Sequence, residues 1–256
     1  MSISSSLAQK IGLSDIDPLF LKLYSTGFEL QSSFDVNSDR RNLLKNIQNY
    51  THVNYGRLKF LYDLSEQVGG SKIEGAFVET GVWRGGSAGI LAYMSKKYNY
   101  KHPLFFFDSF EGLPEPTQED GEDAEIFSNN QTSGNLVPIE KLKAEETYIQ
   151  ELLFEKLSID PTKVNIVKGW FQDTLPVNKD KIEKIAILRL DGDWYESTKV
   201  ALENLYDLVV SGGYIVIDDY YFWDGCKKAV NDFVSEKDLK ININGNVASG
   251  AYIVKP

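Results

Sequence analysis

The sequence has little of several residue types that mark particular classes of protein. Cys226 is its single cysteine, so no disulfide can form within the chain. Lysine and arginine number 27 against 37 aspartate and glutamate residues, which gives a formal net charge of −10 at pH 7. Binding to nucleic acid or to an anionic membrane needs clustered basic side chains, so this charge argues against both partners. An acidic chain instead suits a cationic ligand or a metal ion.

Long apolar runs are also missing from the sequence. No segment approaches the ~20 apolar residues that a membrane-spanning helix needs, and the first residues lack the basic start and apolar core of a secretory signal. We therefore expect a cytoplasmic protein. An apolar content of 42% is ample for a packed core, so the composition excludes a wholly disordered chain.

The hydrophobic pattern changes near residue 70. Before it, apolar residues recur at spacings of three and four, which predicts short amphipathic helices at 7–13, 17–30 and 41–50. After it, apolar runs of strand length alternate with helical segments, which predicts an α/β fold with a mostly parallel sheet covered on both faces. We expect strands at 73–81, 103–110, 163–171, 184–193 and 213–220, then an antiparallel edge hairpin, and helices at 87–98, 145–157, 196–210 and 226–237.

Residues 111–138 interrupt this alternation. The stretch EGLPEPTQEDGEDAEIFSNNQTSGNLVP is acidic, rich in Gly, Pro, Asn and Ser, and too long for an ordinary connection. It leaves the second expected strand at the edge of the sheet where open α/β folds bind their ligands. We therefore predict a lid. In terms of domains, residues 1–69 form a helical extension, and residues 70–256 form the α/β domain that contains this insertion.

A glycine-rich stretch, VETGVWRGGSAG (78–89), joins the first strand to the first helix. Gly81 permits a tight turn, and Ser87 is placed to cap the helix. The pattern differs from the glycine patterns of dinucleotide and triphosphate loops, and Glu79 would repel a pyrophosphate. A carboxylate there suits an ammonium group, such as that of S-adenosylmethionine. Asp108 ends the second strand, where an acid commonly accepts hydrogen bonds from ribose hydroxyls.

Further carboxylates end the fourth and fifth expected strands. Asp191 belongs to LRLDGDWYES, and Asp218 and Asp219 belong to YIVIDDYYF. Carboxylates that meet at one edge of a sheet raise each other's pKa or require a cation between them. Mg²⁺ prefers such oxygen ligands, so the pattern predicts a magnesium site at Asp191, Asp218 and Asp219.

Two other readings of these acids are possible. Asp193 has Glu196 three residues later, just before a helix, so we interpret it as the cap of a capping box in preference to a metal ligand. Arg189 or Lys199 could neutralise the acids in simple salt bridges, and this alternative stays open. His52 and His102 lie outside the motifs, and no direct role is expected for either.

Three stretches resemble the macrocin O-methyltransferase family: ETGVWRGGS, FFFDSFEGLP and LRLDGDWYESTKVALENLYDLVVSGGYIVIDDYYFWDGCKKAV. The resemblance runs from about Phe77 to about Phe233. It implies a Rossmann-like class I methyltransferase fold with a seven-stranded sheet, S-adenosyl-L-methionine as methyl donor, Mg²⁺ as cofactor, and a sugar or glycosylated natural product as acceptor. It also implies pairing of subunits through the N-terminal helices.

By motif position, the resemblance places the metal on Asp191, Asp218 and Asp219. The residues expected at the methyl donor are Glu79, Thr80, Gly81, Val82, Ser87, Asp108, Ser109, Gly169, Trp170, Phe171 and Asp191. Coordination of two neighbouring acceptor hydroxyls would lower a hydroxyl pKa, and Asp191 would accept the proton. The alternative from another class is a metal-dependent D-x-D glycosyltransferase that uses a nucleotide sugar. An NAD-dependent oxidoreductase is disfavoured by the glycine pattern.

Overall fold

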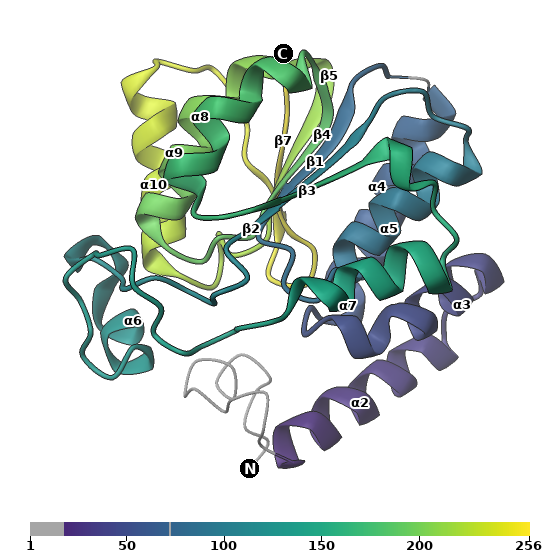
Figure 1. Cartoon of the computed structure of the whole chain (residues 1–256), viewed down its shortest axis with the longest axis horizontal. Helices are drawn as coiled ribbons and strands as arrows, with labels where there is room; N and C mark the ends of the chain where they lie inside the picture. The colour runs from purple at the N-terminus through teal and green to yellow at the C-terminus, as the bar shows by residue number, and fades with distance from the viewer. Residues whose placement is uncertain (1–17, 72) are drawn as a thin grey trace.

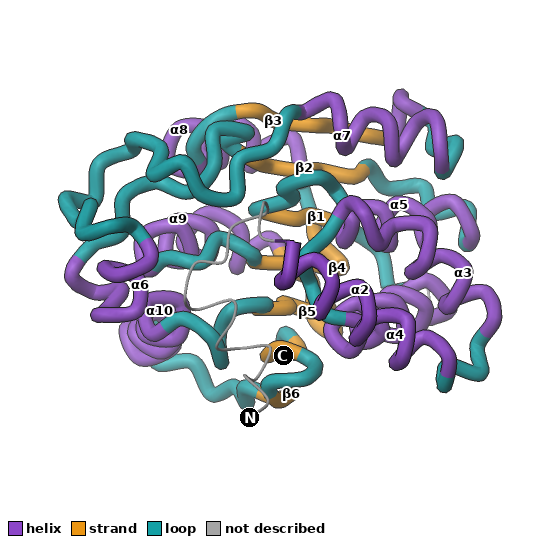
Figure 2. Tube along the Cα trace, turned by 90° about the horizontal axis from the view of Figure 1, so that it is seen from below, coloured by secondary structure: helices purple, strands orange, loops and turns teal. Residues whose placement is uncertain are grey.

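The computed structural model describes residues 18–71 and 73–256, so the helix expected at 7–13 lies outside the described residues. One sheet stands between two layers of helices (Figure 1), with strand order β3-β2-β1-β4-β5-β7-β6 (Figure 2). The strands are β1 (Ala76–Thr80), β2 (Leu104–Asp108), β3 (Val164–Lys168), β4 (Ile185–Leu190), β5 (Val209–Ile217), β6 (Asn244–Asn246) and β7 (Gly250–Val254). β1 to β5 are parallel, while β7 pairs antiparallel with β5 and with β6. The expected mostly parallel sheet with an antiparallel edge hairpin is confirmed.

The helices cover both faces of the sheet (Figure 1). On one face lie α2 (Pro18–Ser33), α3 (Ser38–Ile47), α4 (Tyr55–Ser71), α5 (Gly86–Lys97) and α7 (Glu146–Gln150), and on the other lie α8 (Phe171–Ile182), α9 (Tyr195–Leu205) and α10 (Asp224–Glu236). Side chains of successive strand residues point to opposite faces. Phe77 and Ile187 accordingly join the core under α4 and α5, whereas Val78 and Leu188 join the core under α8 to α10.

The N-terminal helices share the first of these cores. Leu58 and Leu61 of α4 are buried in the same cluster as Phe77 of β1, and α4 contacts α5 and β4. The extension is therefore packed directly on the sheet, which brings its side chains within reach of the strand ends. Within the described ranges, every helix is too short or too polar to cross a bilayer.

Several elements differ from the sequence expectation, and helix α4 is one that was not expected. Helix α8 was not expected, since Pro176 lies inside it and removes one backbone donor. Burial of Leu175 and Ile182 against the sheet compensates for that loss. The helix expected at 196–210 is α-helical only to Leu205, and β5 already begins at Val209. The helix expected at 145–157 is α-helical to residue 150 and continues as a π-helix over 151–156.

The insertion at 111–138 forms short ordered elements. A 3₁₀ turn (Gln118–Asp120) leads into α6 (Gly121–Phe127), and a single antiparallel bridge joins Pro114 to Pro138. In Figure 1 this segment extends beyond the end of the sheet, next to α10.

Candidate active site

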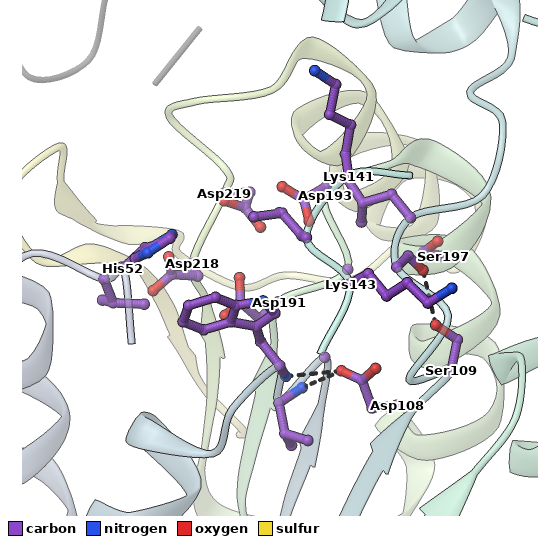
Figure 3. A pocket seen from close by; sticks show the side chains of 18 of the residues that line it. His52, Asp108, Ser109, Lys141, Lys143, Asp191, Asp193, Ser197, Asp218 and Asp219 are labelled. Atoms are coloured by element: carbon purple, nitrogen blue, oxygen red, sulfur yellow. Dashed lines mark hydrogen bonds between the residues drawn. The ribbon is translucent and has the colours of Figure 1, made fainter. Parts of the chain in front are cut away.

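A cavity of about 460 Å³ lies at the carboxyl ends of the strands. From β1 the chain proceeds outward through β2 and β3, and it then returns to add β4 and β5 on the other side. Ligands of open α/β sheets bind where the strand order reverses in this way. Figure 3 shows Asp191, Asp193, Asp218 and Asp219 gathered in this pocket, with His52 on one side and Ser109 on the other.

The glycine loop is fixed between its neighbouring strands. Gly81 has φ +88°, and a Cβ at this position would lie 1.7 Å from the carbonyl oxygen of Asp191, so glycine is required. Asp108 Oδ2 accepts hydrogen bonds from the backbone N–H groups of Val82 and Trp83, at 2.8 and 2.9 Å (Figure 3). Burial raises the pKa of Asp108, and these backbone donors oppose the rise. The loop is thus preformed, and a ribose contact of Asp108 stays a prediction.

Glu79 pairs with a cation of the protein. Its side chain is fully buried and does not line the cavity, and its Oε1 accepts hydrogen bonds from Arg189 Nη1 (2.6 Å) and Ser87 Oγ (2.5 Å). The expectation that Ser87 caps α5 is wrong, because Gly85 is the N-cap and the hydroxyl is used for Glu79. Burial raises the pKa of Glu79 to about 7, against the opposing effect of Arg189. A contact of Glu79 with an ammonium group stays a prediction.

Arg189 joins three of the acids. Its guanidinium is 1% exposed and lies 2.6 Å from Glu79, 2.7 Å from Asp191 and 2.7 Å from Asp218. Arg57, from α4, donates to the other oxygen of Asp218 at 2.7 Å. The salt-bridge alternative is therefore realised in part by Arg189, whereas Lys199 lies over the ring of Tyr195.

Asp191, Asp218 and Asp219 form an acid cluster, and Arg57 and Arg189 do not supply enough positive charge to neutralise it together with Glu79. One oxygen from each of Asp191, Asp218 and Asp219 can be chosen so that all three lie within 4.8 Å of one another. Asp219 Oδ2 is buried and has no hydrogen-bond partner in the described ranges. Burial and then the neighbouring acids raise the pKa of Asp219 well above its usual range, and that of Asp193 to about 8. Oxygen donors with an unpaired buried carboxylate fit a hard divalent cation.

Asp193 is not a helix cap, so the capping-box interpretation is wrong. Its backbone is left-handed (φ +58°), and its Oδ1 accepts a hydrogen bond from Trp223 Nε1 at 2.8 Å. Trp194 is the N-cap residue of α9 and makes no side-chain cap. The backbone N–H of Tyr195 donates instead to Asp120 of the insertion, at 2.6 Å. The acid at the start of α9 thus comes from a distant segment.

The predicted site residues fall into two groups. The cavity is lined by Gly81, Val82, Ser87, Asp108, Ser109, Trp170, Phe171, Asp191, Asp218 and Asp219. Glu79, Thr80 and Gly169 lie behind this lining. The Thr80 carbonyl accepts a hydrogen bond from the backbone of Asp191 at 2.9 Å, and Gly169 donates to the Asp108 carbonyl at 2.9 Å.

Sequence reasoning missed several lining residues. His52, Arg57 and Lys141 reach the cavity from the N-terminal extension and from the segment after the insertion. The rings of His52 and Trp83 lie 4.3 Å apart, and Arg84 lies 4.3 Å above the Trp83 ring. Trp83 differs from these residues, because its position inside the glycine loop already indicated that it lies near the site. Arg57 and His52 had no such signal, because they lie on a helix and a loop far from the motifs.

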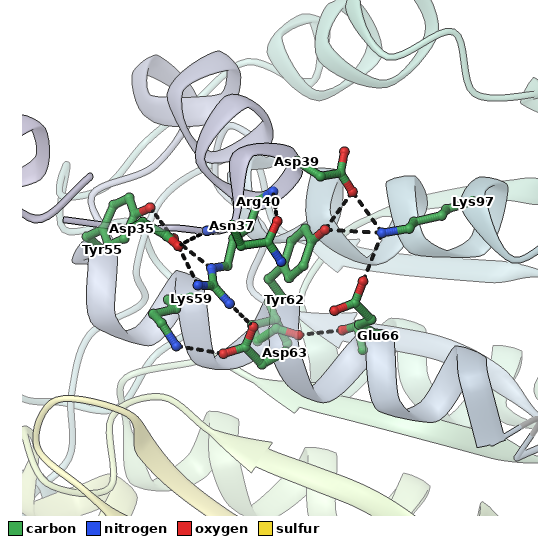
Figure 4. Close-up of polar contacts among 12 residues, drawn as sticks. Asp35, Asn37, Asp39, Arg40, Tyr55, Lys59, Tyr62, Asp63, Glu66 and Lys97 are labelled. Atoms are coloured by element: carbon green, nitrogen blue, oxygen red, sulfur yellow. Dashed lines mark hydrogen bonds and ion pairs between the residues drawn. The ribbon is translucent and has the colours of Figure 1, made fainter. Parts of the chain in front are cut away.

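A polar network fixes the helices that carry these residues (Figure 4). Asp35 Oδ2 accepts hydrogen bonds from Arg40 Nε and from the Tyr55 hydroxyl, both at 2.6 Å. Lys97 of α5 donates to Asp39 of α3 at 2.7 Å. Helices α3, α4 and α5 are therefore linked by charged groups as well as by the core, which holds Arg57 in place.

The sheet order, the glycine loop and the position of the cavity define a class I methyltransferase. Residues 13–255 match the protein family described as macrocin O-methyltransferase (TylF), and the chain belongs to that family. It is a methyltransferase, as the resemblance implied.

Two relatives have named activities. The chain is 36% identical over 186 residues to the 8-demethyl-8-(2,3-dimethoxy-alpha-L-rhamnosyl)-tetracenomycin-C 4'-O-methyltransferase of Streptomyces olivaceus, covering 72% of this chain and 67% of that one. It is 33% identical over 193 residues to the demethyldecarbamoylnovobiocin O-methyltransferase of Streptomyces niveus, covering 74% and 70%.

Solved structures agree with this assignment. The O-methyltransferase NovP matches with a TM-score of 0.68 and 29% identity, over 93% of this chain and 98% of that chain. CalS11, a calicheamicin methyltransferase, matches with a TM-score of 0.63 over 93% of both chains, and at 17% identity this likeness shows the fold alone. The glycosyltransferase alternative gains no support from these matches.

Proposed function

We propose that the protein transfers a methyl group from S-adenosyl-L-methionine to one hydroxyl of a vicinal diol on a sugar or glycosylated natural product, with Mg²⁺ as cofactor. The observation that carries the proposal is the group of Asp191, Asp218 and Asp219 in one cavity, next to the glycine loop. The cavity volume lies within the usual range for small-molecule sites, roughly 300–1,000 Å³.

The names of the relatives support the choice of acceptor. One acts on a rhamnosyl group of a tetracenomycin and the other on a novobiocin precursor. For the donor, support comes from the preformed glycine loop and from Asp108, Ser109 and Trp170 around the same cavity. A catechol acceptor would also present neighbouring hydroxyls, so the acceptor has to be tested separately from the donor.

The residues of the chain have distinct tasks in this reaction. When bound, Mg²⁺ lowers the pKa of a coordinated hydroxyl and S-adenosylmethionine supplies the methyl group. Asp191 is the proposed acceptor of the hydroxyl proton, with its Oδ2 held by Arg189. Arg189 and Arg57 fix both oxygens of Asp218, and Asp219 supplies the carboxylate oxygen that has no partner within the protein's described part.

Isothermal titration tests the donor and the metal separately. S-adenosylhomocysteine and Mg²⁺ are each titrated into the wild type, into Asp219→Asn, and into Asp238→Asn, which removes the same charge from an exposed position. We expect all three proteins to bind S-adenosylhomocysteine, and Asp219→Asn alone to bind Mg²⁺ at least about tenfold more weakly, because one carboxylate ligand is lost. Absence of S-adenosylhomocysteine binding under every condition would contradict the proposed donor. Equal Mg²⁺ affinity of both variants would contradict the metal site.

A matched acceptor pair tests the diol. Methyl transfer to a rhamnoside is compared with transfer to its deoxy analogue, which lacks the hydroxyl next to the methylated one, and with transfer to a catechol. We expect methylation of the rhamnoside and little of the deoxy analogue, because coordination through two hydroxyls is lost. Equal rates on both sugars would rule out the chelated diol, and methylation of the catechol alone would rule out the sugar.

A further inference from the structure

Asp120 is buried, whereas the other acidic residues of the insertion are partly or fully exposed. Its residue is 1% exposed, whereas Glu119 and Glu122 beside it are exposed. Asp120 Oδ1 accepts a hydrogen bond from the backbone N–H of Tyr195, at 2.6 Å, and its Oδ2 accepts from the Thr117 N–H at 2.7 Å and the Thr117 hydroxyl at 3.0 Å. Both oxygens are therefore used, and the carboxylate is not a solvated surface group.

The same carboxylate lies against the start of a second helix. A Cβ built on Gly225, in the first turn of α10, would lie 1.9 Å from Asp120 Oδ1. Tyr195 is the first residue of α9 and Gly225 the second of α10, so one carboxylate lies at the N-terminal ends of both helices. Helix N-terminal ends carry partial positive charge, which favours an acid at this point.

These two helices begin directly after the loops that carry the acid cluster. The loop at 191–194 links β4 to α9 and holds Asp191, and the loop at 218–223 links β5 to α10 and holds Asp218 and Asp219. Where each helix begins therefore sets where its loop ends. A group that is hydrogen-bonded to one helix start and packed against the other also sets the distance between the two loops.

Other contacts tie the insertion to the same loops. Trp194 Nε1 donates a buried hydrogen bond to the Pro114 carbonyl at 2.9 Å. The ring of Phe127, in α6, lies 6.2 Å from the ring of Trp194 and 5.5 Å from that of Trp223. The insertion thus contacts both loops through polar and aromatic groups, with Asp120 at the junction.

We propose that Asp120 is a positioning residue that links closure of the insertion to the arrangement of the two acid-bearing loops. If the insertion leaves, the N–H of Tyr195 loses its acceptor, and the starts of α9 and α10 lose the carboxylate that lies between them. Removal of Asp120 therefore loosens three segments together: 111–138, 191–195 and 218–225. The inference rests on the proposed function only for its effect on metal binding.

Hydrogen exchange measured by mass spectrometry tests the link without any ligand. The proteins are the wild type, Asp120→Ala, the conservative Asp120→Asn, and Glu122→Ala, a control that removes an exposed acid two residues away. We expect Asp120→Ala to raise exchange about fivefold or more in all three segments, the change that loss of a helix cap typically causes. Asp120→Asn keeps an oxygen for the Tyr195 N–H and is expected to be intermediate, while the control resembles the wild type.

Gly225→Ala provides a second approach if Asp120→Ala folds poorly. It leaves the acid intact but places a methyl group where Asp120 Oδ1 lies, while alanine favours the helix itself. We expect the same three segments to exchange faster while the interior of α10 stays protected. Faster exchange confined to 111–138, or raised evenly over the whole chain, would overturn the proposal, because the acid would then serve only local or global stability.

Binding of Mn²⁺, followed by electron paramagnetic resonance, separates this inference from the metal proposal. We expect Asp120→Asn to weaken Mn²⁺ binding several-fold relative to Glu122→Ala, although Asp120 is not a ligand. If the wild type binds Mn²⁺ and Asp120→Asn binds it with the same affinity, the positioning role is overturned. A wild type that binds no Mn²⁺ would instead contradict the proposed metal, and the exchange data would still decide the role of Asp120.

Discussion

Replacement of Arg189 by methionine tests the electrostatic design of the site most directly. The guanidinium is buried and lies 2.6–2.7 Å from Glu79, Asp191 and Asp218, so its loss leaves buried carboxylates without their counter-charge. Removing one partner of a buried ion pair costs about 3–5 kcal/mol. For a chain of this size that corresponds to a fall in Tm of about 6–20 °C. Methionine keeps most of the side-chain volume, so the loss of stability reflects the removed charge more than a change in packing.

The assay is urea unfolding followed by circular dichroism, for Arg189→Met and for Lys227→Met, which changes an exposed lysine in the same way. A double variant with Glu79→Gln is expected to recover part of the stability, because one uncompensated acid is removed with the arginine. The control is expected to stay within about 0.5 kcal/mol of the wild type.

The pH dependence of this variant has a definite sign. Without Arg189, the pKa values of Glu79 and Asp191 in the folded state rise further above those of the unfolded chain, so the folded state binds more protons. Stability lost at pH 8 is therefore partly regained as the pH falls towards 5. A loss below about 1 kcal/mol at pH 8, or a loss that does not change with pH, would refute the electrostatic account.

Three further outcomes are expected. Gly81→Ala, with its forced φ of +88°, is expected to weaken S-adenosylhomocysteine binding at least about tenfold in calorimetry, whereas Gly70→Ala, which has open space around it, leaves binding unchanged. Arg40 holds the pKa of Asp35 well below its usual range. The ionised Asp35 therefore stabilises the folded state above about pH 4, and this stabilisation is lost as the pH falls through the pKa of the folded state. For Asp35→Asn we expect the urea midpoint to depend less steeply on pH in the acid range. The homo-oligomer implied by the family is expected to form through the exposed face of α2, where Leu30 is 61% exposed. Leu30→Glu is therefore expected to be a monomer in light scattering, and a molecular mass equal to that of the wild-type oligomer would exclude that face.

Much of the sheet could be predicted from the sequence because its signals are local. Apolar runs predict β1 and β4, and the position of Asp191 and Asp218 at strand ends predicts that both lie at one edge of the sheet, as the structure confirms. Helix α8 escaped prediction because Pro176 has the local signature of a loop, and only burial against the sheet offsets it. Local signals are thus sufficient where tertiary packing agrees with them.

The partners of the acids could not be predicted because they depend on register and on distant packing. Arg189 faces Glu79 only in the register that pairs β1 with β4. Asp120 and Tyr195 are 75 positions apart, so the actual cap of α9 left no local pattern, while the Asp193 to Glu196 spacing offered a false one. The sequence therefore revealed which acids gather but not which protein groups hold them.

The contacts of Arg57 affect when the site can form during synthesis of the chain. The guanidinium of Arg57 donates to Asp218, 161 positions later, and to the Val247 carbonyl in the turn between β6 and β7, 190 positions later. A chain emerging from the ribosome displays Arg57 early, yet both of its acceptors are translated near the end of synthesis. Helix α4 can fold while translation continues, but Arg57 meets its counter-charge only when β5 brings Asp218 to the sheet, and its second acceptor only when the turn after β6 is made. A nascent chain stalled before β6 would carry the glycine loop and the acids without the second acceptor that holds Arg57.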